Sequence, residues 1–285
     1  MNDGAYGRME RLSPLVRRLL APNPSPFTYT GTQTYVVGDG EVAVIDPGPD
    51  LPEHVDALVS GLAGEKIVAI LCTHTHRDHT PASRPLRAAT GAPIIGCAPL
   101  TIDDDGPRAD ASFDSAYDPD RILADGETIA GPGWTLEAVA TPGHTSNHLC
   151  FALRESGALF TGDHVMGWST TVVSPPDGDM AAYMASMAKL RRREDVIYYP
   201  AHGPAVEKPR AMVRSQMAHR RQREGQILRC VEGGKAVIPA MVEHMYEGID
   251  KRLYPAAGRM VLAHLLDLEA RGKVARDGER WKLAA

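Results

Sequence analysis

The chain has 285 residues, of which 43% are hydrophobic and 24% are charged, values typical of a globular protein with about two domains. No apolar run approaches the roughly 18 residues that cross a bilayer, and the N-terminus has no secretory h-region, so we expect a cytoplasmic protein without a membrane partner. The net charge is −5, and the four cysteines form no CxxC pair, which favours free buried thiols over a disulfide framework.

The N-terminal part of the chain predicts an α/β pattern. Residues 1–30 are rich in proline and are expected to be irregular. Residues 33–37 and 41–46 predict a hairpin, and residues 51–62 predict a helix that begins with a capping box formed by Asp50 and Glu53. The apolar run from residue 67 to 72 predicts a strand buried on both faces. Strand, helix and strand in this order are typical of an α/β fold.

Three histidines and an aspartate follow that buried strand directly, in the segment Thr73-His74-Thr75-His76-Arg77-Asp78-His79. His74 and His76 lie two residues apart in extended backbone, so their side chains point the same way and can bind one metal ion. Asp78 and His79 are adjacent and point in different directions, which suits a second ion. The alternative is a solvated His-rich tract that binds metal only adventitiously, and later segments decide between the two.

The following region continues the alternation of strands and helices. We expect a helix at 82–90, a strand at 92–97, a loop at 98–120, strands at 134–140, 148–153 and 158–161, a helix near 180–190 and a strand at 196–199. Four of the expected strands are each followed, within a few residues, by a side chain that binds metals: His74, His144, Asp163 and His202. Because the ends of these strands converge at one sheet rim, the pattern favours a metal site over unrelated surface histidines.

These residues resemble the metallo-β-lactamase superfamily, whose HxHxDH signature corresponds to His74, His76, Asp78 and His79, with His144, Asp163 and His202 following in the expected order. The resemblance implies an α/β fold, a four-layer αββα sandwich with a two-metal site at one edge. It implies that His74, His76 and His144 hold one metal, that Asp78, His79 and His202 hold the other, and that Asp163 bridges them. Two Zn²⁺ per chain are expected, although Mn²⁺ or Fe²⁺ also suits the second site.

The same resemblance implies the chemistry of a metal-dependent hydrolase. A hydroxide shared by the two metals attacks an electrophilic carbonyl or phosphorus, and Asp78 orients it, so Asp78 and Asp163 are the candidate catalytic residues. Asp46 resembles an aspartate that supports the ligand loop by hydrogen bonding, although it also suits a simple turn before Pro47. His148 is either a similar supporting residue or proton donor, or a structural histidine.

Other segments resemble the mitochondrial β-lactamase-like endoribonucleases and their bacterial relatives, which carry a C-terminal winged-helix-like domain. The matching residues are 31–35, 46–48, 219–228 and 264–274. Helices expected at 206–230, 236–247 and 255–271, and a hairpin turning at Asp277-Gly278, fit that domain. Residues 1–205 are therefore assigned to a catalytic domain and 206–285 to a winged-helix-like domain. Gln33 and Ala201 stand where this subfamily usually has Asn and Gly.

The C-terminal tail is basic: residues 205–285 hold 16 Lys+Arg against 10 Asp+Glu. This balance indicates either a solvated helical face or an anionic partner. The candidate phosphate contacts are Arg220, Arg221 and Arg223 on a helix and Arg276, Arg280 and Lys282 on the wing. The endoribonuclease resemblance and the basic tail together favour hydrolysis of RNA phosphodiesters, with single-stranded RNA as the substrate. The alternatives are a hydrolase of a small-molecule thioester or ester, of glyoxalase II type, and a non-catalytic nucleic-acid-binding protein.

Overall fold

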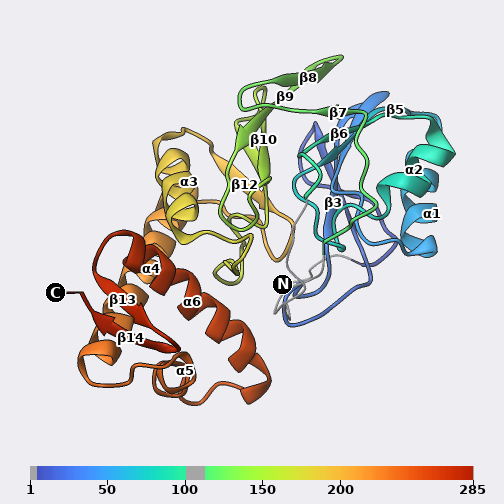
Figure 1. Cartoon of the computed structure of the whole chain (residues 1–285). Coiled ribbons are helices and arrows are strands. Elements are labelled where there is room, and N and C mark those ends of the chain that lie inside the picture. The colour runs from blue at the N-terminus through green and yellow to red at the C-terminus, as the bar shows by residue number, and fades with distance from the viewer. Residues whose placement is uncertain (1–4, 101–112, 285) are drawn as a thin grey trace.

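The computed structural model describes residues 5–100 and 113–284, whose strands form three sheets (Figure 1). In the first sheet each strand pairs with the next along the chain. Its strands are β1 (Glu10–Arg11), β2 (Val16–Leu20), β3 (Gln33–Asp39), β4 (Glu41–Ile45), β5 (Lys66–Cys72), β6 (Ile94–Gly96) and β7 (Arg121–Ile122). Strands β1 to β4 pair antiparallel, and β4 to β7 pair parallel.

The second sheet has the order β12-β11-β10-β9-β8. Its strands are β8 (Thr128–Gly131), β9 (Trp134–Ala140), β10 (Leu149–Leu153), β11 (Ala158–Gly162) and β12 (Ile197–Pro200). The parallel pair β11 and β12 is connected through helix α3 (Met180–Arg192), and the other pairs are antiparallel. The connection through α3 brings the C-terminal ends of β11 and β12 to the same edge of the sheet.

The two sheets pack face to face around one apolar core. Val36 and Leu71 from the first sheet and Phe151 and Phe160 from the second are each no more than 1% exposed. Helices α1 (Pro52–Gly61) and α2 (Ser83–Thr90) lie outside the first sheet, and α3 lies outside the second (Figure 1). The αββα sandwich predicted from the sequence is confirmed.

Two local predictions in the N-terminal region are wrong. Residues 16–20, which were expected to be irregular, form β2. Arg17 interrupts the apolar pattern of this strand, and its charge is paired with Glu65 at 2.6 Å. Helix α1 has Leu51 as its N-cap without a side-chain hydrogen bond, so Asp50 forms no capping box there. The loop expected at 98–120 lies partly outside the described residues, and its described part forms no helix or strand beyond one β-bridge between Phe113 and His76.

The C-terminal part is a small helical unit with a β-hairpin. It consists of α4 (Pro209–Glu232), α5 (Ile238–Met245), the 3₁₀ helix η1 (Lys251–Leu253), α6 (Tyr254–Ala270), β13 (Val274–Asp277) and β14 (Arg280–Leu283). Ile227, Met241, Leu265 and Trp281 are buried in a core of their own. The predicted winged helix is confirmed, while the division at residues 205 and 206 stays a prediction.

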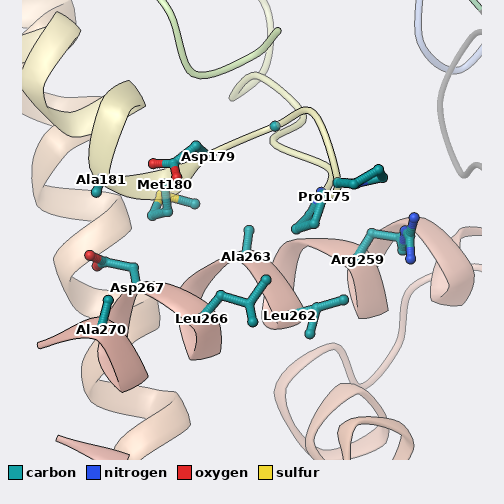
Figure 2. Close-up of a pocket in the computed structure, with 12 residues that line it drawn as sticks. Pro175, Asp179, Met180, Ala181, Arg259, Leu262, Ala263, Leu266, Asp267 and Ala270 are labelled. Atoms are coloured by element: carbon teal, nitrogen blue, oxygen red, sulfur yellow. The ribbon is translucent and has the colours of Figure 1, made fainter. Parts of the chain in front are cut away.

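Helices α4 and α6 also pack against α3, where Val213, Met217 and Ala263 join a core that includes residues of the second sheet. A groove of about 450 Å³ remains between the beginning of α3 and α6, and Figure 2 shows Met180 and Leu266 on its two sides. The four cysteines are buried and free, as predicted. In the described part of the chain, no helix is long and apolar enough to cross a membrane.

Candidate metal centre

The loop that follows β5 is held in place by Asp46, which directly follows the neighbouring parallel strand β4. Asp46 accepts hydrogen bonds from the Thr73 backbone amide and from the Thr73 hydroxyl, both at 2.8 Å. Its Oδ2 also lies 2.9 Å from Nδ1 of His79. Asp46 has a φ of 48°, in the left-handed region that Asp and Asn adopt more readily than most other residues. One carboxylate therefore fixes both ends of the segment that carries the histidines.

Three imidazole nitrogens from two loops face one another in the first cluster. Nδ1 of His76 lies 3.0 Å from Nε2 of His74 and 3.1 Å from Nε2 of His144. Nitrogens bound to one zinc ion with tetrahedral geometry lie about 3.3 Å apart, since each Zn–N bond is about 2.0–2.1 Å long. The spacing of these three nitrogens is close to that of ligands of one ion.

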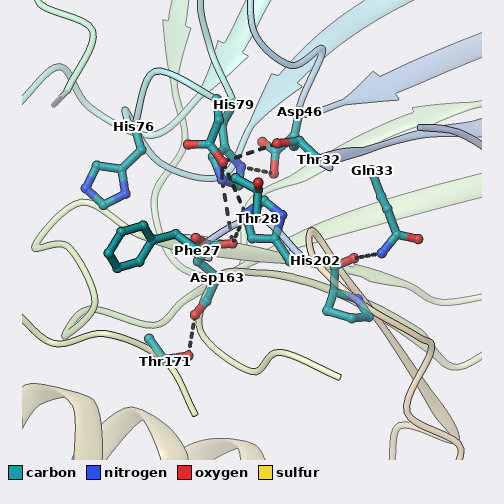
Figure 3. Close-up of polar contacts among 12 residues, drawn as sticks. Phe27, Thr28, Thr32, Gln33, Asp46, His76, His79, Asp163, Thr171 and His202 are labelled. Carbon is teal, nitrogen blue, oxygen red and sulfur yellow. Dashed lines mark hydrogen bonds and ion pairs between the residues drawn. The ribbon is translucent and has the colours of Figure 1, made fainter. Parts of the chain in front are cut away.

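The second cluster combines His79 and His202 with carboxylates. Oδ2 of Asp78 lies 3.4 Å from Nε2 of His79 and 3.1 Å from Nε2 of His202. Oδ1 of Asp163 lies 3.5 and 3.2 Å from the same two nitrogens. Figure 3 shows His79, Asp163 and His202 converging below Asp46. Two carboxylates and two imidazoles thus surround one small space.

Asp163 belongs to both clusters. Its Oδ1 faces His79 and His202, whereas its Oδ2 lies 3.6 Å from Nε2 of His144. The two clusters therefore share one carboxylate, which is the arrangement that the sequence resemblance implied. All seven predicted ligands are brought together here, from the ends of strands in both sheets.

Burial and neighbouring charges divide the imidazoles into two kinds. Burial holds the pKa of His74 well below its ordinary value and lowers that of His76 to about 3, so both rings are neutral, the form that binds a metal. Burial acts in the same direction on His202, but Asp163 and Asp78 outweigh it and raise its pKa to about 10. Burial acts to raise the pKa of Asp78, yet the neighbouring His79 holds it well below its usual range.

Unpartnered polar atoms give a test of whether the residues fit metal ions. Nε2 of His79 and Oδ1 of Asp163 are buried and form no hydrogen bond with a described residue, only the ion-pair contacts of 3.2 to 3.5 Å within the second cluster. Buried polar groups normally have partners, and these two atoms point into the space of the second cluster. Within each cluster the ligand atoms lie within 4.8 Å of one another. The residues therefore fit a divalent metal ion at each cluster.

His148 supports the backbone of Asp163. Its Nε2 accepts the amide N–H of Asp163 at 3.2 Å, and its Nδ1 lies 2.9 Å from the Thr141 hydroxyl, so both ring nitrogens are engaged. This close approach requires Gly162, because a Cβ there would lie 2.7 Å from Nε2 of His148. His148 thus lies against a candidate ligand as a supporting residue, with no nitrogen left to serve as a proton donor.

Several supporting contacts escaped the sequence analysis. The Thr32 hydroxyl donates to Oδ2 of Asp78 at 3.2 Å, and the carbonyl of Val172 lies 2.6 Å from Nδ1 of His144. Gln33 donates to the carbonyls of Pro200 and Gly203, on either side of His202. Gln33 stands where the subfamily usually has Asn, and this difference could have pointed to a role for its side chain. A contact made by a backbone carbonyl, such as that of Val172, cannot be predicted from residue types.

A cavity of about 740 Å³ opens directly onto the two clusters. The candidate ligands at its floor are His76, Asp78, His144, Asp163 and His202. Its walls come from the N-terminal loop (residues 25–28), the 166–172 loop and the C-terminal helices. The walls are mainly apolar, and the side chains involved are Pro26, Phe27, Met166, Trp168, Val172, Tyr246, Ile249, Leu253 and Met260. The groove of Figure 2 contains none of the candidate ligands. The C-terminal unit therefore closes one side of the candidate active site.

The structure contradicts one expectation for the basic tail, that Arg220 belongs to an exposed surface for RNA phosphates. Arg220 is only 2% exposed, donates to the Thr171 carbonyl and lies over the ring of Tyr183, with the guanidinium carbon 5.2 Å from the ring centroid. Arg223 is partly buried against Tyr246. The sequence of α4 does not reveal that Arg220 is buried, because periodicity alone does not tell which face of the helix packs against the catalytic part. Arg221, Arg276 and Arg280 are exposed, so their contacts with phosphate stay predictions.

Comparisons with known proteins decide the family. Residues 28–202 match the metallo-beta-lactamase superfamily, and residues 238–281 match the beta-lactamase associated winged helix domain. The chain belongs to the metallo-beta-lactamase superfamily. It is a metal-dependent hydrolase with a C-terminal winged-helix domain. These matches do not confirm the endoribonuclease subfamily suggested by the sequence.

Individual relatives agree with this assignment. The chain is 31% identical to the lactamase-like protein ptaB of Pestalotiopsis fici, over 86% of this chain and 76% of the relative. It is 33% identical to the atrochrysone carboxyl ACP thioesterase dmxR1 of Cryptosporiopsis sp., over 82% of this chain and 68% of the relative. A beta-lactamase domain protein from Burkholderia ambifaria has the same fold, with a TM-score of 0.81, 20% identity and coverage of 99% and 96% of the two chains.

Proposed function

We propose that this metallo-beta-lactamase superfamily member hydrolyses acyl thioesters, and that the acyl group of the substrate lies in the cavity above the metal centre. The observation that carries the proposal is the cavity itself, which joins apolar walls to the candidate ligands. Ligand sites of small molecules are concave, mainly apolar and about 300–1,000 Å³ in volume. An acyl chain suits such walls, whereas an RNA backbone offers phosphates and riboses.

Two further observations support a thioester over the RNA substrate preferred from the sequence. That preference depended on the endoribonuclease resemblance, which the family matches do not confirm, and on the basic tail, whose Arg220 is buried beside the cavity. The relative from Cryptosporiopsis is named as an ACP thioesterase, and it matches this chain over most of its length. Together they favour the alternative that the sequence analysis left open, a small-molecule thioester or ester.

The roles of the site residues follow from their positions. We assign His74, His76 and His144 to one metal, Asp78, His79 and His202 to the other, and Asp163 to both, with zinc as the expected ion because imidazoles predominate. When bound, such metals polarise a carbonyl oxygen and lower the pKa of water toward 7. Asp78, which accepts from Thr32, orients the attacking group, and the cavity walls hold the acyl carbonyl over the ligands.

The test compares substrates and one altered wall. Zinc-loaded protein would be assayed in parallel with acyl thioesters of increasing chain length, single-stranded RNA and a β-lactam. In Ala256→Phe the new ring enters the cavity, so KM for the longer thioesters should rise about 10-fold or more with unchanged metal content. Ala270→Phe, at the exposed end of the same helix, is the matched control. Thioester turnover that is absent, or equal in the two variants, would contradict the proposal.

A further inference from the structure

Two arginines line the cavity without any carboxylate partner in the described part of the chain. Arg220 and Arg223 project from successive turns of α4, and both border the cavity together with His219. Neither arginine forms a salt bridge with a described residue. Glu224 follows Arg223 in the sequence of α4, but its carboxylate pairs with Arg271. Other arginines of this region do find carboxylates, as Arg210 finds Glu194.

Their hydrogen bonds leave part of each guanidinium unused. Arg220 donates from Nη2 to the Thr171 carbonyl, whereas its buried Nε has no partner among the described residues. The two hydrogen bonds of Arg223 both leave from Nη1, to Gln226 at 2.9 Å and to the Met245 carbonyl at 3.2 Å. Its Nε and Nη2 bond to no described residue. Two cations thus offer free N–H groups beside the same cavity.

Neighbouring groups hold the arginine side chains in place. The guanidinium carbon of Arg223 lies 4.5 Å from the centroid of the Tyr246 ring, and Arg220 lies over Tyr183. Burial lowers the pKa of His264 to about 3, and the charge of Arg220 acts in the same direction, so this imidazole stays neutral. Burial and the two arginines also lower the pKa of His219. The positive charge on this wall therefore belongs to the two arginines.

Buried charges are normally paired, because removing a charge from water is unfavourable unless an opposite charge or several hydrogen bonds replace the water. A guanidinium binds carboxylate or phosphate oxygens through two parallel N–H groups. We propose that Arg220 and Arg223 form a subsite for an anionic group of the substrate, a carboxylate on the acyl chain or a phosphate on its thiol carrier. The inference rests on the proposed thioesterase function for the class of substrate.

Arg223 is the residue to change, because Arg220 also holds the Thr171 carbonyl beside the metal centre. The Thr171 hydroxyl donates to the Asp163 carbonyl at 2.6 Å, a contact seen in Figure 3. Because Arg220 holds Thr171, the loss of Arg220 would also disturb Asp163, a candidate ligand. Arg223→Gln keeps a polar side chain and removes the cation. Arg221→Gln is the matched control, since Arg221 is exposed on the same helix and does not line the cavity.

The test measures binding, not turnover, with the zinc-loaded full-length chain and calorimetry. One arm compares N-propyl adipamate, which has a carboxylate and a non-hydrolysable amide, with neutral N-propylhexanamide. The other compares pantetheine 4′-phosphate with pantetheine. Wild type and Arg221→Gln should prefer one anionic probe over its neutral partner, and Arg223→Gln should lose about 10- to 100-fold in affinity for that probe alone. The arm that shows this loss identifies the source of the anion.

Two outcomes would overturn the subsite. One is equal affinity of wild type for charged and neutral probes in both arms, including undetectable binding of all four. The other is an unchanged preference in Arg223→Gln with equal zinc content. Because no probe is hydrolysed, the result is separate from the proposed activity. An arginine-dependent preference in a protein that cleaves no thioester would keep the anion subsite and reject the thioesterase.

Discussion

Oδ2 of Asp46 lies 2.9 Å from Nδ1 of His79, and the same carboxylate accepts the backbone amide and hydroxyl of Thr73. A residue that belongs to no cluster thereby positions both the start of the ligand loop and one of its imidazoles. An N–H on Nδ1 that donates to Asp46 leaves Nε2 of His79 free to face Asp78 and Asp163. The carboxylate–imidazole pair sets which nitrogen of His79 would bind a metal ion.

Replacing Asp46 should therefore weaken the second metal site without unfolding the protein. We expect Asp46→Ala to lower activity or metal affinity about 10–100-fold, the usual effect of losing such an outer hydrogen bond. Asp46→Asn should cost less, because Asn tolerates the φ of 48° and keeps one acceptor oxygen. Metal titration of both variants checks this. Equal metal affinity in Asp46→Ala and wild type would show that Asp46 is only a turn residue.

The two clusters predict two metal ions per chain. Elemental analysis after reconstitution should give nearly two equivalents, mainly zinc, and a chelator should abolish turnover. Asp78→Ala and His202→Ala should each retain about one equivalent and lose most turnover, because both ligands face the second cluster. Circular dichroism should stay unchanged, since these residues lie at the rim and not in the apolar core. Two full equivalents in His202→Ala would refute the assignment.

The fold and the ligands could be predicted because their signals are local or regular. His74, His76, Asp78 and His79 stand within one heptapeptide, and the strand ends before His144 and Asp163 placed the other ligands on one rim. Apolar periodicity likewise located α3 and the C-terminal helices. The prediction for residues 16–20 was wrong because two arginines interrupt the apolar pattern of β2. The buried position of Arg17 is explained only by its tertiary pairing with Glu65.

The substrate side of the site could not be predicted in the same way. Arg220 looked like part of an exposed basic run, since sequence spacing does not tell which face of α4 packs on α3 and the 166–172 loop. The cavity is assembled from the N-terminal loop, the 166–172 loop and the C-terminal helices, which are distant in sequence. Local pattern carries no information about how such segments meet, and it is their packing that favours a thioester over RNA.

The Arg17–Glu65 pair predicts a pH-dependent stability. The Arg17 guanidinium, which donates to both Glu65 oxygens, holds the pKa of this carboxyl below its ordinary value of 4.5. A lowered pKa in the folded state means that the stabilisation is complete above pH 4.5 and is lost as pH falls through the folded value. Glu65→Gln should lower the free energy of unfolding by about 1–3 kcal/mol at pH 7.

Urea unfolding of wild type and Glu65→Gln across a pH series checks this, with the difference shrinking below pH 4.5. The control is Glu41→Gln, because the Glu41–Lys66 pair is exposed and such pairs contribute only about 0–1 kcal/mol. A constant difference between wild type and Glu65→Gln at all pH values would mean that the loss comes from packing and not from charge.

The exposed arginines of the wing give the last prediction. Arg276 and Arg280 lie on the β13–β14 hairpin and do not line the cavity, so Arg276→Gln with Arg280→Gln should leave thioester turnover within about twofold. If the chain binds single-stranded RNA, its affinity should depend less on salt in the double variant. The plot of log K against log salt concentration should become less steep by about 0.7 for each phosphate contact removed. Filter binding across a salt series measures the slope, and the thioester assay runs beside it. RNA cleavage by wild type that disappears in the double variant would place RNA at the metal centre and reverse our choice of substrate.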